Sequence, residues 1–280
     1  MSDKLLFSET RIRDLHRRAL RMRTVDAAFL SVQAGREIAA RLAVTNRDFR
    51  NVLVLDAFPE ALAEQISGAI ENANIVSLDI ALLGDDLELQ HTSHELIVAG
   101  PALHRRNDLP GTLIQIRRAL VPDGLFMGTL PGEGTLEELR QSLIAAEALV
   151  TGGAASRIDP FIEIRQAGSL LQRAGFALPV ADSETLDLRY GDIMNLVRDL
   201  RANGASSASA ETIHPLRRSV FESAVGHYRK NHSDDHDRLK VSVSLVYLSG
   251  WAPHESQQKP LSPGSASHRL ADFIGRGENE

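Results

Sequence analysis

The sequence has 280 residues, of which 43% are hydrophobic and 24% are charged, as in an ordinary globular protein. This length supports one large α/β domain or two small ones with a substantial core. No apolar run approaches the roughly 20 residues that a membrane-spanning helix requires. The net charge of −6 argues against a general nucleic-acid-binding protein. The chain has no cysteine, which excludes disulfides, thiol catalysis and cysteine-ligated zinc, and we expect a cytoplasmic protein.

The N-terminal segment, residues 1–45, is predicted to be helical from about residue 8 to residue 43, because its apolar residues recur with helical spacing. Its first 25 residues carry six arginines, which also suits a targeting peptide. Acidic residues interrupt this basic run, and the apolar core of a secretory signal is missing. A solvated helix is therefore the favoured interpretation.

A short apolar run from Val52 to Leu55, closed by Asp56, is typical of a buried parallel strand that opens an α/β unit. The turn at Phe58-Pro59 leads into a helix that starts at Glu60. Further apolar runs predict strands over 75–79, 87–90, 95–99, 125–130, 185–190 and 241–251. Between them, helical patterns begin after Asp108, at 135, at 164, at 193 and at 215.

This alternation predicts an α/β fold with a doubly wound, mostly parallel, seven-stranded sheet. We expect the main domain over residues 46–251, a helical insertion over about 192–230 before the last strand, and a coil tail over 252–280. Asp108 is a plausible N-cap, Thr135 and Glu138 have the spacing of a capping box, and Gly175 fits a helix C′ position.

Two carboxylates close the first two predicted strands, where ligands of such sheets bind. Asp79 suits a ribose, because an ionised carboxylate accepts two hydroxyl hydrogen bonds, and a solvated turn aspartate is an equal alternative. For Asp56 a helix N-cap is favoured over a ligand contact. The turn over 57–60 has no glycine, although a turn that cradles a nucleotide usually contains one.

Other polar clusters have simpler interpretations. Gly132 and Gly134 lack the Gly-Lys-Ser/Thr ending of a phosphate-binding loop. The histidines between 227 and 236 are irregularly spaced for a metal site and suit a polar loop better. The adjacent His254, Glu255 and Ser256 do not make a hydrolytic triad, which is assembled in space rather than in sequence. No residue stands out as a general base, so the catalytic residues are unknown and no metal is expected.

Four segments carry a family resemblance: residues 103–110, 132–140, 173–176 and 250–257. Together they resemble class I S-adenosylmethionine-dependent methyltransferases, in particular the bacterial relatives of mitochondrial complex I assembly factor 5. A more distant similarity is to malonyl-carrier-protein methyltransferases. The resemblance covers roughly residues 7–270, and the C-terminal segment is its most specific part. Order of strands and helices alone is a weak sign of function.

The resemblance implies an S-adenosylmethionine site at the carboxyl ends of the strands. Asp56 matches the aspartate of the family's Asp-x-Gly-x-Gly motif, whereas Ala57, Phe58, Pro59 and Glu60 do not supply its glycines. Asp79 matches the carboxylate that holds the ribose hydroxyls. The implied cofactor-binding residues are Asp56, Phe58, Asp79, Ile80, Asp85, Asp86 and Gly100.

Two functions remain open at this point. Because Phe58 adds bulk and Pro59 removes an N–H donor, we expect a crowded site and impaired or lost cofactor binding. The chain would then be an assembly protein whose partner, by resemblance, is a respiratory complex subunit. The alternative is an active methyltransferase, or an arginine-hydroxylase-type enzyme, that acts on a protein or small molecule. The sequence leaves the oligomeric state open.

Overall fold

The computed structural model describes residues 5–22, 28–211 and 214–257. Most of the predicted tail, 252–280, therefore lies outside the described residues, as do positions 23–27 of the predicted N-terminal helix. That helical segment contains two helices, α1 (Glu9–Met22) and α2 (Phe29–Ala43). In the described ranges, no helix combines the length and the apolar character needed to cross a membrane.

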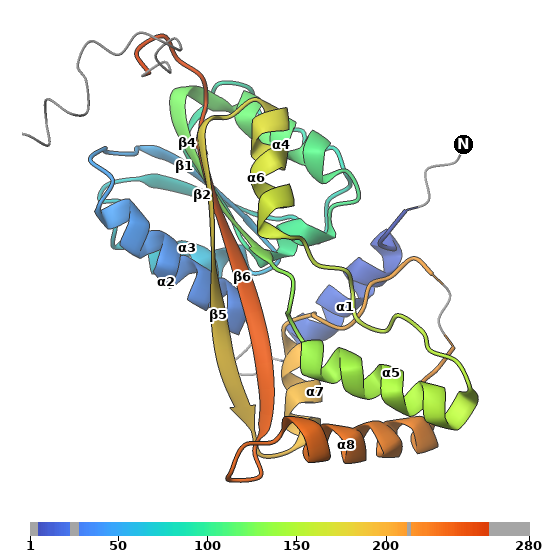
Figure 1. Ribbon diagram of the computed structural model, residues 1–280. Coiled ribbons are helices and arrows are strands. Elements are labelled where there is room, and N and C mark those ends of the chain that lie inside the picture. Colours follow the sequence, from blue (N-terminus) through green and yellow to red (C-terminus); the bar gives the residue numbers. More distant parts are fainter. Residues whose placement is uncertain (1–4, 23–27, 212–213, 258–280) are drawn as a thin grey trace, which may run out of the picture.

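The described residues form one six-stranded sheet with the order β2-β1-β3-β4-β6-β5 (Figure 1). Its strands are β1 (Asn51–Asp56), β2 (Asn74–Asp79), β3 (His94–Ala99), β4 (Leu120–Pro131), β5 (Ala177–Tyr190) and β6 (Leu239–Trp251). β6 is antiparallel to both of its neighbours, β4 and β5, whereas β1 to β4 pair in parallel. The doubly wound, mostly parallel architecture predicted from the sequence is confirmed.

Alternating side chains of β1 supply both halves of the core. Val52 and Val54 pack on one face, and Leu53 and Leu55 pack on the other. All four are buried, and each such side chain stabilises the fold by about 1.5–3 kcal/mol. Helices α2 and α3 (Pro59–Ser67) cover the first face, and α4 (Leu109–Ala119) and α6 (Ile164–Ala174) cover the second (Figure 1).

The predicted strand over 87–90 is not present, so the expectation of seven strands was wrong by one. Glu88 has a left-handed backbone, with φ 49°, which an extended strand does not allow. Its N–H donates to the side chain of Asp86, and the N–H of Leu87 donates to the side chain of Gln115. These side chains take the backbone donors that a strand would use in a ladder.

The predicted helical insertion lies between β5 and β6 as α7 (Ile193–Ala202) and α8 (Arg218–His232). Helix α8 lies beside α5 (Glu137–Thr151), next to the far ends of β5 and β6 (Figure 1). Leu143 and Ala146 of α5 pack against Val220 and Ala224 of α8 in a separate small core. These helices enlarge the molecule at the carboxyl end of β4.

Two of the three helix-end predictions are confirmed. Asp108 caps α4 by accepting from the N–H of Gly111 at 2.8 Å, and Gly175 ends α6 with φ 84°. The prediction of a capping box was wrong, because the side chains of Thr135 and Glu138 both bind strand β6. The Oγ1 atom of Thr135 donates to the carbonyl of Ser244 at 3.1 Å. Glu138 accepts from the N–H and the hydroxyl of Ser242.

The order β2-β1-β3 creates a switch point. The chain leaves β1 for β2 and then returns to place β3 on the other side of β1. Helices that follow the two strands therefore diverge, and a crevice opens beyond their carboxyl ends. Asp56 ends β1 at this crevice, and the short 3-10 helix η1 (Pro101–Arg105) follows β3.

Candidate functional site

A cavity of about 400 Å³ lies beyond the carboxyl ends of β1 and β3. One face of α1 lines it with residues at helical spacing: Glu9, Ile12, Arg13 and His16. The other walls come from the turn after β1, from η1, and from helices α5 and α7. The cavity therefore joins the switch point of the sheet to the helices that follow β4 and β5.

Asp56 is a buried hub of this site, with only 1% of its surface exposed. One carboxyl oxygen accepts from the Ser31 hydroxyl of α2 and the Phe58 N–H, and the other accepts from the Ala102 N–H at 3.1 Å. Burial raises the pKa of Asp56, against the opposing effect of the Ser31 hydrogen bond. Helix α3 begins after Phe58 without a side-chain cap, so the N-cap prediction for Asp56 was wrong.

The carboxyl group of Asp79 is bound from within the protein. The Nε2 atom of His16 lies 2.7 Å from Oδ2 of Asp79, and the Ala81 N–H donates to Oδ1 at 3.0 Å. His16 is 3% exposed and meets the edge of the Phe58 ring, with the ring centres 5.6 Å apart. His16 lines the cavity, whereas Asp79 does not, so at this point of the wall the cavity meets the imidazole rather than the carboxylate.

The structure brings four of the seven predicted cofactor residues to the cavity wall: Asp56, Phe58, Ile80 and Asp85. Asp79, Asp86 and Gly100 do not line it. Asp85 forms an ion pair with Arg106 at 3.4 Å, and the same guanidinium binds the carbonyls of Ile80, Leu83 and Gly84. Arg106 thus fixes the loop that follows β2.

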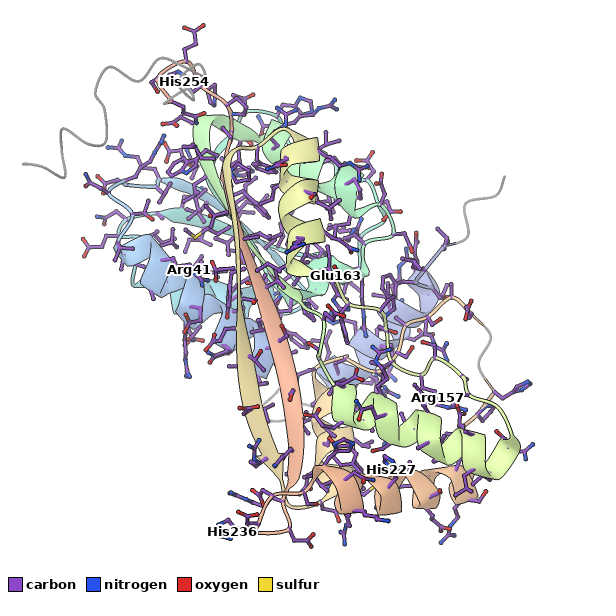
Figure 2. The ribbon with its side chains drawn as sticks, viewed as in Figure 1. Arg41, Arg157, Glu163, His227, His236 and His254 are labelled. Carbon is purple, nitrogen blue, oxygen red and sulfur yellow. The ribbon has the colours of Figure 1, made fainter. Side chains whose placement is uncertain are left out.

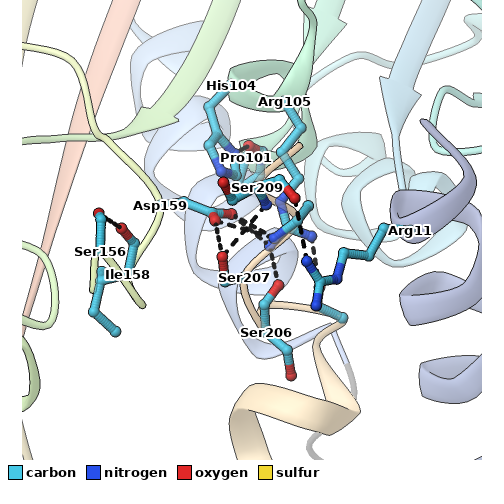
Figure 3. Close-up of polar contacts among 12 residues, drawn as sticks. Arg11, Pro101, His104, Arg105, Ser156, Ile158, Asp159, Ser206, Ser207 and Ser209 are labelled. Atoms are coloured by element: carbon cyan, nitrogen blue, oxygen red, sulfur yellow. Dashed lines mark hydrogen bonds and ion pairs between the residues drawn. The ribbon is translucent and has the colours of Figure 1, made fainter. Parts of the chain in front are cut away.

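Arg105 and Asp159 form a buried network that the sequence reasoning did not identify (Figure 3). The guanidinium donates to Asp159 at 3.1 Å and to the carbonyls of Gly204 and Ser206 at 2.6 and 2.7 Å. Asp159 also accepts from the Ser207 hydroxyl at 2.7 Å. This network ties η1 to the loop after α7. In the sequence, Arg105 lies in the segment 103–110, which is one of the four that carry the family resemblance.

His104 also lines the cavity and was missed at the sequence level. Its Nδ1 atom lies 2.8 Å from the carbonyl of Pro101, so this nitrogen carries the proton and Nε2 is an acceptor. Burial and the nearby charge of Arg105 lower the pKa of His104 to about 4, so it is neutral at neutral pH. Its ring packs between those of Phe7 and Phe161.

The other histidines of the described ranges do not line the cavity. His227 bonds to Ser142 of α5, and His236 lies at the turn before β6 (Figure 2). In the ranges that the structure describes, no three histidine, aspartate or glutamate side chains are grouped to hold a metal ion. His254 bonds to Ser256 at 2.7 Å on the exposed segment after β6.

The curated proteins that this chain resembles include two groups, arginine-hydroxylases and malonyl-[acyl-carrier protein] O-methyltransferases. No family model matches the chain. It is 35% identical over 195 residues to "Arginine-hydroxylase NDUFAF5, mitochondrial" of Dictyostelium discoideum, covering 69% of this chain and 45% of that protein. It is 32% identical over 262 residues to the protein of the same name from Rattus norvegicus, covering 88% and 76%.

A "Malonyl-[acyl-carrier protein] O-methyltransferase" of Methylovorus is 29% identical over 293 residues, covering 94% of this chain and 96% of that protein. Among solved structures, a putative methyltransferase from Bacillus halodurans superposes with a TM-score of 0.50 at 11% identity, covering 78% and 98%. This last likeness shows the fold alone. The chain spans less than half of the Dictyostelium relative that it matches.

Proposed function

The chain belongs to the family of the mitochondrial NDUFAF5 proteins, and from this premise we propose that it is a methyltransferase-fold assembly protein with impaired S-adenosylmethionine binding. Its partner would be a subunit of a respiratory complex, and its place of action the cytoplasm. The proposed role in assembly rests on the family relationship, and the proposed impairment of cofactor binding rests on the contacts of Asp56 and Asp79.

One observation carries this proposal: the hydrogen bond between His16 and Asp79. A ribose would have to share the carboxylate oxygens of Asp79 with the imidazole and the Ala81 N–H, which bind one oxygen each. Asp56 is likewise bound by Ser31, and the turn that holds Phe58 offers no N–H at Pro59. The residues present therefore fit an adenosyl cofactor poorly, because side chains of the two N-terminal helices already bind both carboxylates.

Titration of the full chain with S-adenosylmethionine and S-adenosylhomocysteine tests the proposal. A ligand that binds only the native state would raise the unfolding free energy by about 2.7 kcal/mol at 100 times its Kd. We expect no shift of the thermal midpoint at millimolar ligand for the wild-type chain. A saturable shift with a micromolar Kd would overturn the proposal of impaired binding.

The His16→Ala variant separates the two possible causes of weak binding. If the imidazole blocks the ribose carboxylate, His16→Ala gains a shift with S-adenosylhomocysteine, and adding Asp79→Ala abolishes that gain. His254→Ala is the matched control, because His254 lies on the exposed segment after β6. If His16→Ala gains nothing, the glycine-free turn at Phe58 is the dominant obstacle and the His16 argument fails.

An active S-adenosylmethionine-dependent enzyme is the second candidate, and the cavity itself favours it. Its volume of about 400 Å³ is in the range of small-molecule sites, and Ile80 and Asp85 line it. Under this function the wild-type chain binds the cofactor, and Asp79→Ala weakens that binding.

The assembly role has its own test in a strain that lacks this chain. We expect less assembled respiratory complex on native gels, with recovery when the wild-type chain is restored. An Asp79→Ala chain should restore assembly equally well if the role is non-catalytic. Failure of that variant to restore assembly, at equal protein level, would favour the enzyme.

A further inference from the structure

The half of the cavity farthest from β1 has an apolar wall. Helix α5 contributes Leu139 and Leu143, and helix α7 contributes Val197 and Leu200. The residues Ile158, Phe161 and Val243 complete this wall. We call it the apolar chamber. A hydrocarbon group that left water for such a chamber would gain binding free energy in proportion to its buried area.

The charged side chains that line the cavity are almost all paired within the protein. Glu9 pairs with Arg13, Asp85 with Arg106, Asp159 with Arg105, and Arg157 with Glu147. Asp56 is held by hydrogen bonds, and His104 is neutral. Only Arg201 remains, since no ion pair joins it to a carboxylate in the described part of the chain. The cavity therefore presents one unpaired positive charge.

Arg201 is exposed although it lines the cavity, so it marks the opening to solvent. A second arginine stands beside it: helix α1 packs against α7, and Arg18 of α1 donates to the Ser206 hydroxyl, also in the cavity wall, at 2.9 Å. The charge of Arg201 and partial burial lower the pKa of Arg18, with burial the larger cause. Arg18 does not itself line the cavity, but its guanidinium is near enough to Arg201 for the two charges to interact, and no ion pair joins either of them to a carboxylate in the described part of the chain.

We propose that the cavity binds a single-chain amphiphile with an anionic head, with its hydrocarbon chain in the apolar chamber and its head at Arg18 and Arg201. The other charged side chains of the wall are paired within the protein, so they offer no unpaired charge to a polar tail. The rim offers two donors that suit a carboxylate or a phosphate. This inference does not depend on whether S-adenosylmethionine binds.

Calorimetric titration of the full chain with hexanoate, octanoate and decanoate tests the proposal. We expect the Kd to fall by up to about fourfold for each added methylene group, because this factor corresponds to the free energy gained when one methylene group leaves water. Octanol, which has the same chain without the charge, should bind more weakly than octanoate. Equal affinity for octanol and octanoate, or no binding of decanoate at millimolar concentration, would overturn the proposal.

Variants on α7 and α5 assign the two halves of the ligand. Arg201→Gln should weaken octanoate binding by up to about fivefold, the range for an exposed charge contact, and leave octanol binding unchanged. Arg198→Gln, one turn away and bonded to Asn195, is the matched control and should change neither. Leu139→Trp should weaken both ligands by filling the apolar chamber. If Arg201→Gln and Arg198→Gln behave alike, the rim does not hold the head.

Discussion

Gly100 lies directly against the carboxyl group of Asp56, and no space remains between them for a Cβ atom. An ideal Cβ at this position would overlap Cγ and both oxygens of Asp56. The contact arises because Asp56 reaches across the switch point to accept from the N–H of Ala102 in η1. The carboxyl group at the end of β1 can therefore pack against the start of η1 because residue 100 has no side chain.

Gly100→Ala should destabilise the fold. The added methyl group must displace either the buried carboxyl or the backbone of η1, and overpacking of this kind costs about 1–3 kcal/mol. Urea denaturation of the two proteins measures the difference. Gly226→Ala in α8 is the control, because a Cβ there meets nothing within 4 Å and alanine is the better helix former. Gly226→Ala should not destabilise, and an equal loss in both variants would contradict the explanation.

The buried carboxyl of Asp56 should make stability depend on pH in an unusual direction. Its pKa in the folded protein lies above the ordinary value of 3.8, so the folded chain holds this proton more tightly than the unfolded chain does. The Asp56 contribution to the unfolding free energy therefore falls as the pH rises above 3.8, by at most about 1.4 kcal/mol per pH unit.

Asp56→Asn isolates this effect from the other carboxylates. The neutral amide does not titrate, so the stability of the variant relative to the wild type should improve as the pH is raised from about 4 to about 7. Chemical denaturation at several pH values gives this difference. A difference that stays constant over that range would show that Asp56 has the same pKa in both states.

Asp159→Asn should be strongly destabilising, because it leaves the Arg105 guanidinium buried without its counter-charge. The two side chains are only 12% and 4% exposed, and breaking such a buried pair costs about 3–5 kcal/mol. Arg218→Ala breaks the exposed pair between Arg218 and Glu222 and should cost less than about 1 kcal/mol. The unfolding free energies of both variants decide the comparison, and similar losses would mean that Arg105 is effectively solvated.

The strands and the helix ends could be predicted where the deciding interactions are local. The run from Val52 to Leu55 is apolar at every position because both of its faces are covered, and this pattern is visible in sequence. The side chain of Asp108 caps a helix three residues away, within the same short segment. Such features depend on neighbours in the chain, so composition and spacing reveal them.

The site could be predicted only in part, because its decisive contacts join distant residues. His16 is 63 positions from Asp79, and Ser31 is 25 positions from Asp56. The sequence around an aspartate does not show whether its carboxylate is free to bind a ligand or is already bound by a side chain from a distant helix. The capping-box prediction at Thr135 failed for the same reason, since its partner Ser244 is 109 positions away.

Asn107 should hold the start of α1 over the cavity, and Asn107→Ala should release it. The side chain of Asn107 accepts from the N–H of Phe7 at 2.9 Å and donates to its carbonyl at 3.1 Å. Loss of two such hydrogen bonds should lower the unfolding free energy by about 1–3 kcal/mol and speed amide exchange at Phe7 and Ser8. The Ser8 amide reports on the same segment, because it donates to the carbonyl of Ala208 at 2.9 Å.

Asn195→Ala is the control for that variant, because the side chain of Asn195 accepts from the exposed Arg198 on its own helix. It should change neither the stability nor the exchange at Phe7. Hydrogen exchange read by mass spectrometry resolves the N-terminal segment from the sheet. If Asn107→Ala leaves that segment as protected as Asn195→Ala does, then the bridge to Ala208 and the His16–Asp79 hydrogen bond are sufficient to hold α1.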